Sequence, residues 1–184
     1  MKSSTIIFQR ILMSNLTGPT PGLIIASVLF RHDIHSEKEI LKTLELKFGP
    51  YVTFHHSYFP MREYYSKEMG ESELLSRVFI AFHKPVQRDD LVEAKVWADQ
   101  FEKGFLYAGK REINLDMGLL TLENLVLATG KNYSHRPYLG QGVFADLTLI
   151  MKNGQFQTTP WTYPDYSHPE VIDFFTWARQ FLSH

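Results

Sequence analysis

The chain has 184 residues, enough for one domain to bury most of its apolar surface. Its 44% hydrophobic and 21% charged residues are ordinary for a globular protein and exclude a fibrous or disordered chain. With 19 basic against 20 acidic residues, no strong net charge favours nucleic acid as a partner. Cysteine is absent, which excludes disulfides, thiolate nucleophiles and thiolate metal sites and fits a cytoplasmic protein.

The chain contains no stretch that predicts a membrane partner. Its longest apolar run, 23–30, is far shorter than the roughly 20 residues of a membrane-spanning helix. The first 16 residues lack the long apolar core of a secretory signal. The strongest chain break is Gly18-Pro19-Thr20-Pro21-Gly22. We therefore expect an N-terminal arm at 1–21 and one domain at 22–184.

Two successive β-α-β units are predicted in the first part of this domain. The expected strands lie at 23–30, 51–57, 77–82 and 111–116. The first is continuously apolar, which is typical of a central strand buried on both faces. Ser36 with Glu39 forms a capping box for a helix after the first strand, and Asp89 or Asp90 caps a second helix. Two such units indicate a ferredoxin-like split β-α-β core.

The rest of the chain predicts further antiparallel strands and a final helix. The strand candidates are 122–129, 136–139 and 143–151. Asn153-Gly154 is a hairpin turn signal. Ser167 with Glu170 forms a second capping box, and Pro169 suits the first turn of the last helix. The predicted fold class is thus α+β, a single domain with the split β-α-β core, extra antiparallel strands and a C-terminal helix.

Several polar and aromatic strings resemble one known family. They are Tyr-Tyr-x-x-Glu-Met-Gly at 64–70, Arg-x-Ile-Asn-Leu-Asp-x-Gly at 111–118, Leu-Ala-Thr-x-Lys-Asn at 127–132, His-Arg-x-Tyr-Leu at 135–139, Gly-Val-Phe-Ala-Asp-Leu-Thr-Leu at 142–149 and Trp-Thr-Tyr-Pro-Asp-Tyr at 161–166. In this order they resemble the uncharacterised prokaryotic family catalogued as domain of unknown function 4416. Met117 stands where we expect Pro, and Arg62 where we expect Thr. The resemblance implies a shared fold and site but brings no activity.

Three residues are candidates for catalysis. Glu68 could act as a general acid or base, or could hold a loop by a backbone hydrogen bond. Asp116, with Asn114 two residues before it, could ligate a divalent cation or accept from a substrate hydroxyl. An Asx-type turn of Asp116 with Gly118 is the favoured alternative. His135 is a proton carrier near neutral pH.

A cluster of basic side chains within one loop predicts an anion site. Lys131, His135 and Arg136 lie close together in the sequence, and the alternative is an internal ion-pair network. Asp146, in an otherwise apolar strand, is predicted to pair with Arg136 or Arg111 because an isolated buried charge is costly. The full predicted ligand-binding set is Arg77, Arg111, Asn114, Lys131, Arg136, Tyr64, Tyr65, Asp146, Tyr163 and Asp165. Strand alternation places Glu112, Asn114 and Asp116 on one face and Arg111 on the other.

Three functions remain open. The first is binding of a small anionic ligand, a nucleotide or phosphorylated metabolite, in a pocket framed by Tyr64, Tyr65 and Tyr163. The second is a phosphoryl-transfer or hydrolytic enzyme that uses Mg²⁺ or Mn²⁺, held by Glu68, Asp116, Asp146 or Asp165, with His135 as acid or base. The third is an interaction module with an exposed patch around Trp161 and Tyr166.

Zinc is not expected, because His32-x-x-His35 and His55-His56 have no third ligand at suitable spacing. The sequence leaves the oligomeric state open.

Overall fold

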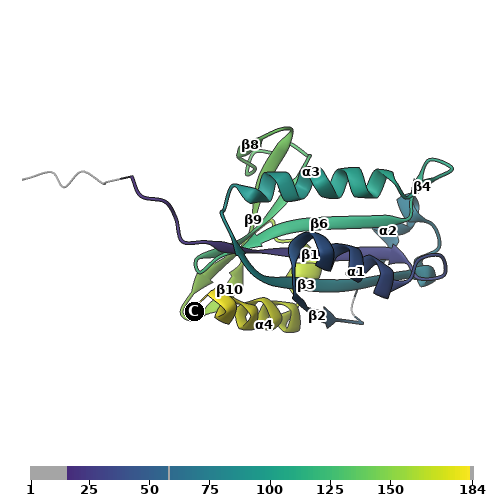
Figure 1. The fold of residues 1–184 in the computed structure, drawn as a ribbon. Helices are drawn as coiled ribbons and strands as arrows, with labels where there is room; N and C mark the ends of the chain where they lie inside the picture. The colour runs from purple at the N-terminus through teal and green to yellow at the C-terminus, as the bar shows by residue number, and fades with distance from the viewer. Residues whose placement is uncertain (1–15, 58, 183–184) are drawn as a thin grey trace, which may run out of the picture.

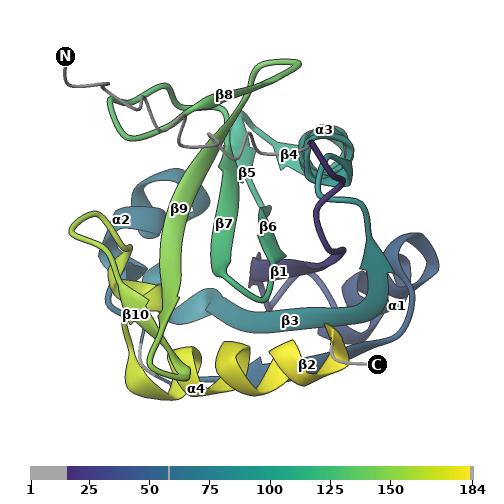
Figure 2. The same cartoon turned by 90° about the vertical axis from the view of Figure 1, so that its left-hand side faces the viewer.

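The computed structural model describes residues 16–57 and 59–182, which form an eight-stranded antiparallel sheet with helices on both faces (Figures 1 and 2). The strands are β1 (Gly22–Arg31), β2 (Tyr51–His55), β3 (Leu75–Val86), β6 (Ile113–Leu120), β7 (Asn124–Thr129), β8 (Tyr138–Gly140), β9 (Val143–Lys152) and β10 (Gln155–Thr158). β4 (Leu106–Tyr107) and β5 (Lys110–Arg111) form a separate small hairpin. The helices are α1 (Glu37–Phe48), α2 (Arg62–Met69), α3 (Asp90–Lys103) and α4 (Pro169–Ala178), with 3-10 turns at Ser72–Leu74, Pro164–Tyr166 and Arg179–Leu182. The predicted α+β class is confirmed.

The strand order is β10-β9-β7-β6-β1-β3-β2, and β8 lies off this path and pairs with the first residues of β9, Val143 and Phe144. Helix α1 connects β1 to β2, and β3 lies between those two strands. Helix α3 lies between β3 and β6 in the chain, and β1 separates those two strands in the sheet. Each of the two helices therefore joins strands that have one antiparallel strand between them.

β1 is buried on both faces, as its continuous apolar sequence predicts. Ile24 and Val28 pack with α1 and α3 in one core, whereas Leu23 and Ile25 pack with α4 in the other. The reason is its central position, because β3 and β6 flank it and helices cover both faces (Figure 2).

Helix α4 lies along one face of the sheet through a stripe of buried side chains, which are Val171, Phe174, Phe175 and Ala178. The capping box predicted at Ser167 is wrong. The N-cap is His168, whose Nδ1 accepts from Glu170 N at 3.4 Å, while Ser167 Oγ donates to Pro164 O. The preceding 3-10 turn thus uses the Ser167 hydroxyl. Ser36 is the N-cap of α1, but its side chain makes no cap hydrogen bond either.

Helix α2 has no counterpart among the predicted elements, where residues 64–70 are treated as a polar segment. Met69 is its buried residue, and its N-cap, Met61, offers no capping hydrogen bond. A helix with so little apolar periodicity gives no sequence signal. Met69 packs with Leu29 and Leu75 in a third, small apolar cluster.

The turn predicted at Asp116 and Gly118 is also wrong, because both residues lie inside β6. A Cβ atom on Gly118 would lie 2.8 Å from Ile25 Cδ1 and 2.9 Å from Val126 O. Glycine is therefore needed here for the close packing of neighbouring strands rather than for a turn.

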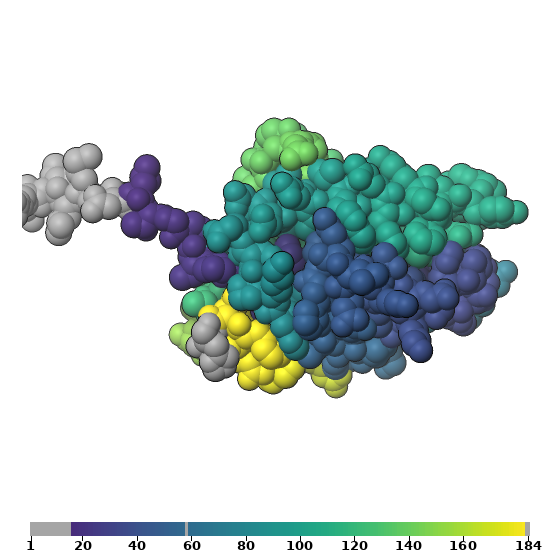
Figure 3. Space-filling view, viewed as in Figure 1, coloured from purple at the N-terminus to yellow at the C-terminus, as the bar shows by residue number. Residues whose placement is uncertain are grey.

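The described part of the predicted N-terminal arm, residues 16–21, is exposed and leads away from the sheet (purple in Figures 1 and 3). Arg88 Nε donates to Thr20 O at 2.8 Å and so fixes the last residues of the arm to the domain. Residues 1–15 of the arm lie outside the described residues. Among those that are described, no helix combines the length and apolar composition of a membrane span.

Candidate functional site

Buried polar side chains interrupt the apolar sheet face that α4 partly covers. In the β1–β6 pairing Ser27 lies opposite Asp116, and Leu29 lies opposite Asn114; in the β1–β3 pairing Leu29 also lies opposite Arg77. Paired residues share a face, so these polar groups lie between the apolar cluster beneath α4 and the small cluster next to α2. The sheet thus presents a polar surface inside the protein.

A cavity of about 410 Å³ lies over this surface, and we call it the central pocket. It is bounded by α2, α3, β6, β7, β9 and the Pro164–Tyr166 turn. The predicted site residues that line it are Tyr64, Tyr65, Glu68, Arg111, Asn114, Asp116, Lys131, Asp146, Tyr163 and Asp165. The structure brings these residues together from segments that are far apart in the sequence. Three predicted residues, Arg77, His135 and Arg136, do not line the pocket.

Arg136 supports the pocket wall. Its Nε donates to Asp146 Oδ2 at 2.8 Å, which confirms the predicted pair, and a terminal nitrogen donates to Tyr163 OH at 2.6 Å. The other terminal nitrogen donates to Lys131 O at 3.2 Å. The side chain is 7% exposed and its charge is neutralised by Asp146. Arg136 is therefore not the free cation for an anion that the sequence suggests.

Arg77 is neutralised in the same way, by an ion pair with Asp165 in which both side chains are buried. Its guanidinium lies 4.3 Å from the centre of the Phe59 ring and 5.3 Å from that of Tyr65. This arrangement fixes Asp165 and Tyr65 at the pocket wall. Burial, with a smaller contribution from Asp116, raises the pKa of Tyr65, so its phenol stays protonated and donates to Asp116 Oδ2 at 3.4 Å.

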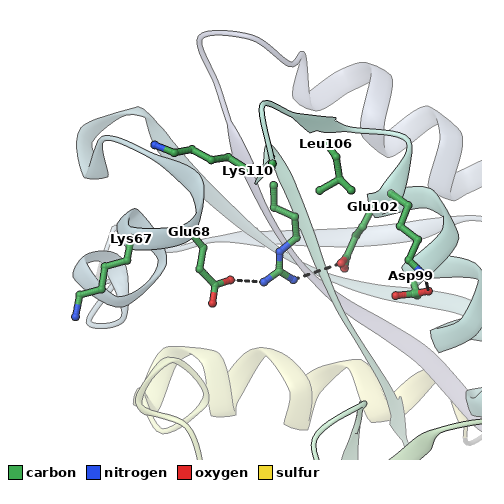
Figure 4. Close-up of a pocket in the computed structure, with 9 residues that line it drawn as sticks. Lys67, Glu68, Asp99, Glu102, Leu106 and Lys110 are labelled. Carbon is green, nitrogen blue, oxygen red and sulfur yellow. Dashed lines mark hydrogen bonds and ion pairs between the residues drawn. The ribbon is translucent and has the colours of Figure 1, made fainter.

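Arg111 joins α2 to α3 across the end of the central pocket. It forms ion pairs with Glu68 on α2 and, at 3.4 Å, with Glu102 on α3, and it donates to Asn114 Oδ1 at 2.7 Å. On the other side of Arg111 lies a more open pocket of about 450 Å³, which we call the outer pocket (Figure 4). Glu68, Glu102 and Arg111 line both pockets. Arg111 thus forms part of the partition between two cavities.

The predicted strand alternation across 111–116 is confirmed for Asn114 and Asp116, which share a face of β6, but is wrong at 111–112. Arg111 ends β5, β6 begins at Ile113, and the break between them turns Arg111 toward Asn114. Glu112 instead bonds His35 Nε2 at 2.8 Å.

Three pocket residues on α3, Lys95, Asp99 and Glu102, were missed by sequence reasoning. Glu102 is 7% exposed and its Oε1 accepts from Leu115 N at 2.6 Å. Burial raises the pKa of the Glu102 carboxyl, although Lys95 opposes the shift. A signal existed, because the buried helix face of Leu91, Ala94 and Ala98 continues at helical spacing to a charged residue.

The charges that remain after these pairings are few. Lys95 and Lys131 form no ion pair with a carboxylate in the described ranges, and Asp116 has Tyr65 as its hydrogen-bonding side chain. Four other buried polar atoms of the pocket lining have no partner within the described chain: Asn114 Nδ2, Asp146 Oδ1, Asp165 Oδ1 and Tyr166 OH. An unpartnered buried polar group costs about 1–3 kcal/mol, so such a cluster favours a ligand.

The family model described as Domain of unknown function (DUF4416) matches residues 20–181. The chain belongs to this family. The resemblance inferred from the sequence strings is thereby confirmed. Comparison with curated proteins and with solved structures found no match.

The four candidate carboxylates of this DUF4416 chain line the central pocket without forming a three-carboxylate cluster. No three of Glu68, Asp116, Asp146 and Asp165 place oxygen atoms within 4.8 Å of one another. His135 stacks on Trp161 with ring centres 4.8 Å apart, and its Nε2 lies 3.6 Å from Asp146 Oδ2. Its place outside the pocket lining gives it no direct access to a ligand there.

The aromatic segment 161–166 of the DUF4416 chain does not form the exposed patch that an interaction module would need. Trp161 is 39% exposed, and its indole nitrogen donates to Leu147 O at 2.9 Å. Tyr166 is 2% exposed and packs against Phe79 and Phe175. The segment contributes Tyr163, Asp165 and Tyr166 to the pocket lining instead.

Proposed function

We propose that this chain binds a small anionic metabolite that carries hydroxyl groups, of the nucleotide or sugar-phosphate class, in the central pocket. The observation that carries this proposal is a set of buried polar atoms around one cavity that have no partner among the described residues. The same cavity is lined by two lysines that form no ion pair with a described residue. We place this function in the cytoplasm, because the cysteine-free composition fits a reducing compartment.

The groups left after internal pairing match the two parts of such a ligand. Lys131 and Lys95 supply positive charge for a phosphate or carboxylate. Asp116 and the free oxygens of Asp146 and Asp165 accept hydrogen bonds from hydroxyl groups, and Asn114 Nδ2 donates one. Each acceptor would regain a hydrogen bond that the buried site otherwise lacks, so binding relieves a desolvation cost.

The internal ion pairs make the pocket rigid before a ligand arrives. Arg136 fixes Asp146 and Tyr163, while Arg77 fixes Asp165. Tyr64 is 45% exposed and its hydroxyl lies 3.4 Å from Lys131 Nζ, so an aromatic ring stands beside the cation. A flat base or a sugar face could pack on this ring.

Thermal unfolding against a panel of nucleotides and sugar phosphates tests the proposal. A ligand at about 100 times its dissociation constant adds about 2.7 kcal/mol of stability, which a melting curve resolves. We expect the stabilisation to fall in Lys131→Met and Asp116→Asn. Lys38→Met, which alters an exposed lysine on α1, should respond like the wild type. No stabilisation by any compound, or equal stabilisation of the Lys131 and Lys38 variants, would overturn the proposal.

A metal-assisted phosphoryl-transfer or hydrolytic enzyme is the second candidate. It is favoured by the free carboxylate oxygens of Asp146 and Asp165 in the same cavity, since Mg²⁺ and Mn²⁺ prefer oxygen ligands and bind phosphates. Adding Mg²⁺ should then strengthen binding of the stabilising phosphate compound and release a product. Binding that is indifferent to Mg²⁺ and leaves the compound intact would leave the simple binding function.

A further inference from the structure

The end of β2 and the start of α4 bring two imidazoles and one carboxylate together. One ligand atom from each of His56, His168 and Glu170 can be chosen so that all three lie within 4.8 Å of one another. His56 Nε2 lies 2.9 Å from Glu170 Oε2, and the two imidazole centres are 4.1 Å apart. None of these residues lines the central or the outer pocket. The cluster is thus independent of the proposed ligand site.

We propose that His56, His168 and Glu170 bind a divalent transition metal of the Zn²⁺ class. Two imidazole nitrogens and a carboxylate oxygen form a ligand set that proteins use for such ions, with a fourth position open to water. Zn²⁺ bonds of about 2.0–2.2 Å place tetrahedral ligands about 3.4 Å apart, so small side-chain rotations complete the site. The carboxylate offsets the positive end of the α4 dipole, which alone would repel a cation.

The three ligands are held by structure on two sides. The His56 side chain is 9% exposed and lies against Phe54, with ring centres 5.9 Å apart. His168 and Glu170 belong to the N-cap and first turn of α4, whose buried stripe anchors the helix on the sheet. Their separation is therefore set by the packing of α4 near β2, and the site needs no change of fold.

One of the contacts that metal binding would replace is weak. His168 Nδ1 accepts from Glu170 N at 3.4 Å, the long end of a hydrogen bond. A neutral metal-bound imidazole carries its proton on the other nitrogen. If Nδ1 binds the metal, its lone pair is occupied; if Nε2 binds, Nδ1 carries the proton. In both cases this cap bond is exchanged for a metal bond.

A metal here would connect the end of β2 to the turn that precedes α4. Pro164–Tyr166 lies two residues before His168 and supplies Asp165 and Tyr166 to the central pocket. Met61, which also lines that pocket, follows the same strand end that carries His56. An ion at this site would therefore steady two segments of the pocket wall without entering the pocket.

Calorimetric titration of chelator-treated protein with Zn²⁺ at neutral pH tests this site. We expect one Zn²⁺ per chain and more than about 100-fold weaker binding in His56→Gln and Glu170→Gln. Loss of a residue that only hydrogen-bonds a metal ligand weakens metal binding by about 10–100-fold, and loss of a ligand itself should cost more. His55→Gln is the matched control, because His55 bonds Glu37 Oε1 at 2.7 Å in a two-residue pair. It should bind Zn²⁺ like the wild type, and Mg²⁺ should not compete.

Thermal unfolding supplies the second measurement. Zn²⁺ should raise the melting temperature of the wild type and of His55→Gln, and should leave Glu170→Gln unchanged. The Glu170 side chain is 64% exposed, so this variant keeps the test valid even if His56→Gln fails to fold. Absence of Zn²⁺ binding, or equal affinity in the wild type and Glu170→Gln, would overturn the proposal.

Discussion

Arg136 and Asp146 form a buried ion pair that joins the segment before β8 to the centre of β9. Arg136 Nε lies 2.8 Å from Asp146 Oδ2, and Asp146 is 1% exposed. The arginine holds one carboxylate oxygen, while the other, Oδ1, has no partner within the described chain and belongs to a pocket-lining residue. The ion pair therefore prepares Asp146 as an acceptor whose charge is already balanced.

Removal of one partner of this pair should be costly. Arg136→Met leaves the Asp146 charge buried and unpaired, and we expect a loss of about 3–5 kcal/mol in the free energy of unfolding, measured with urea. The double variant Arg136→Met/Asp146→Leu should be more stable than Arg136→Met alone, because no buried charge remains. A double variant at the sum of the two single losses would show that the two side chains have no coupling energy, which would contradict this account of the pair.

Substitution of Gly118 should disturb the sheet beneath the pocket. An alanine Cβ would lie within 3.0 Å of atoms of Ile25, Val126 and Leu127, so Gly118→Ala should lose about 1–3 kcal/mol through overpacking. Gly130→Ala is the control, since its Cβ would meet nothing within 4 Å. Equal unfolding free energies for both variants would mean that the strands separate at little cost.

The fold was predicted well where the apolar pattern is strong. The continuous run of β1, the stripe of α4 and the Asn153-Gly154 hairpin each rest on a local rule, and the structure contains all three elements. Both central turn residues have positive φ, 54° and 84°, as that hairpin requires. Helix α2 was missed because it has only one buried residue, Met69, and therefore no apolar stripe in its sequence. The turn at Asp116 was wrong because Gly118 is required by the close packing of neighbouring strands, which the local sequence does not reveal.

Replacement of Glu102 should change how stability depends on pH. Burial raises the pKa of Glu102 in the folded protein above its usual value of 4.5, so the unfolded chain ionises first as pH rises. The wild type should then lose stability relative to Glu102→Gln above about pH 4.5, by about 1.4 kcal/mol for each unit between the two pKa values. At lower pH the difference should level off.

Urea unfolding of both proteins across this pH range measures the effect. If the wild type instead becomes more stable relative to Glu102→Gln as pH rises, then the attraction of Lys95 and Arg111 for the ionised carboxylate outweighs the cost of burying its charge.

The site was only partly predictable, because residues were identified more readily than their partners. Most of the predicted set lines one pocket, since polar residues at strand positions are conspicuous. Whether Arg136 is free or paired depends on where the loop before β8 meets β9, and no local rule gives that contact. The imidazoles of His56 and His168 meet only because α4 packs back near β2.

Arg111→Lys should loosen α2 without unfolding the protein. The guanidinium contacts Glu68, Glu102 and Asn114 together. A lysine ammonium is a compact charge without the planar fork of donors, so it cannot make all three contacts. Since α2 otherwise buries Met69, its hold on the protein depends strongly on this contact. Amide hydrogen exchange of α2 should therefore become faster, while exchange in β1, which lies in the central core, should change little. Uniformly faster exchange across both elements would instead show that Arg111 stabilises the whole fold. Unchanged exchange in α2 would show that the other contacts of the helix, those of Met69, Tyr65 and Arg62, hold it without Arg111.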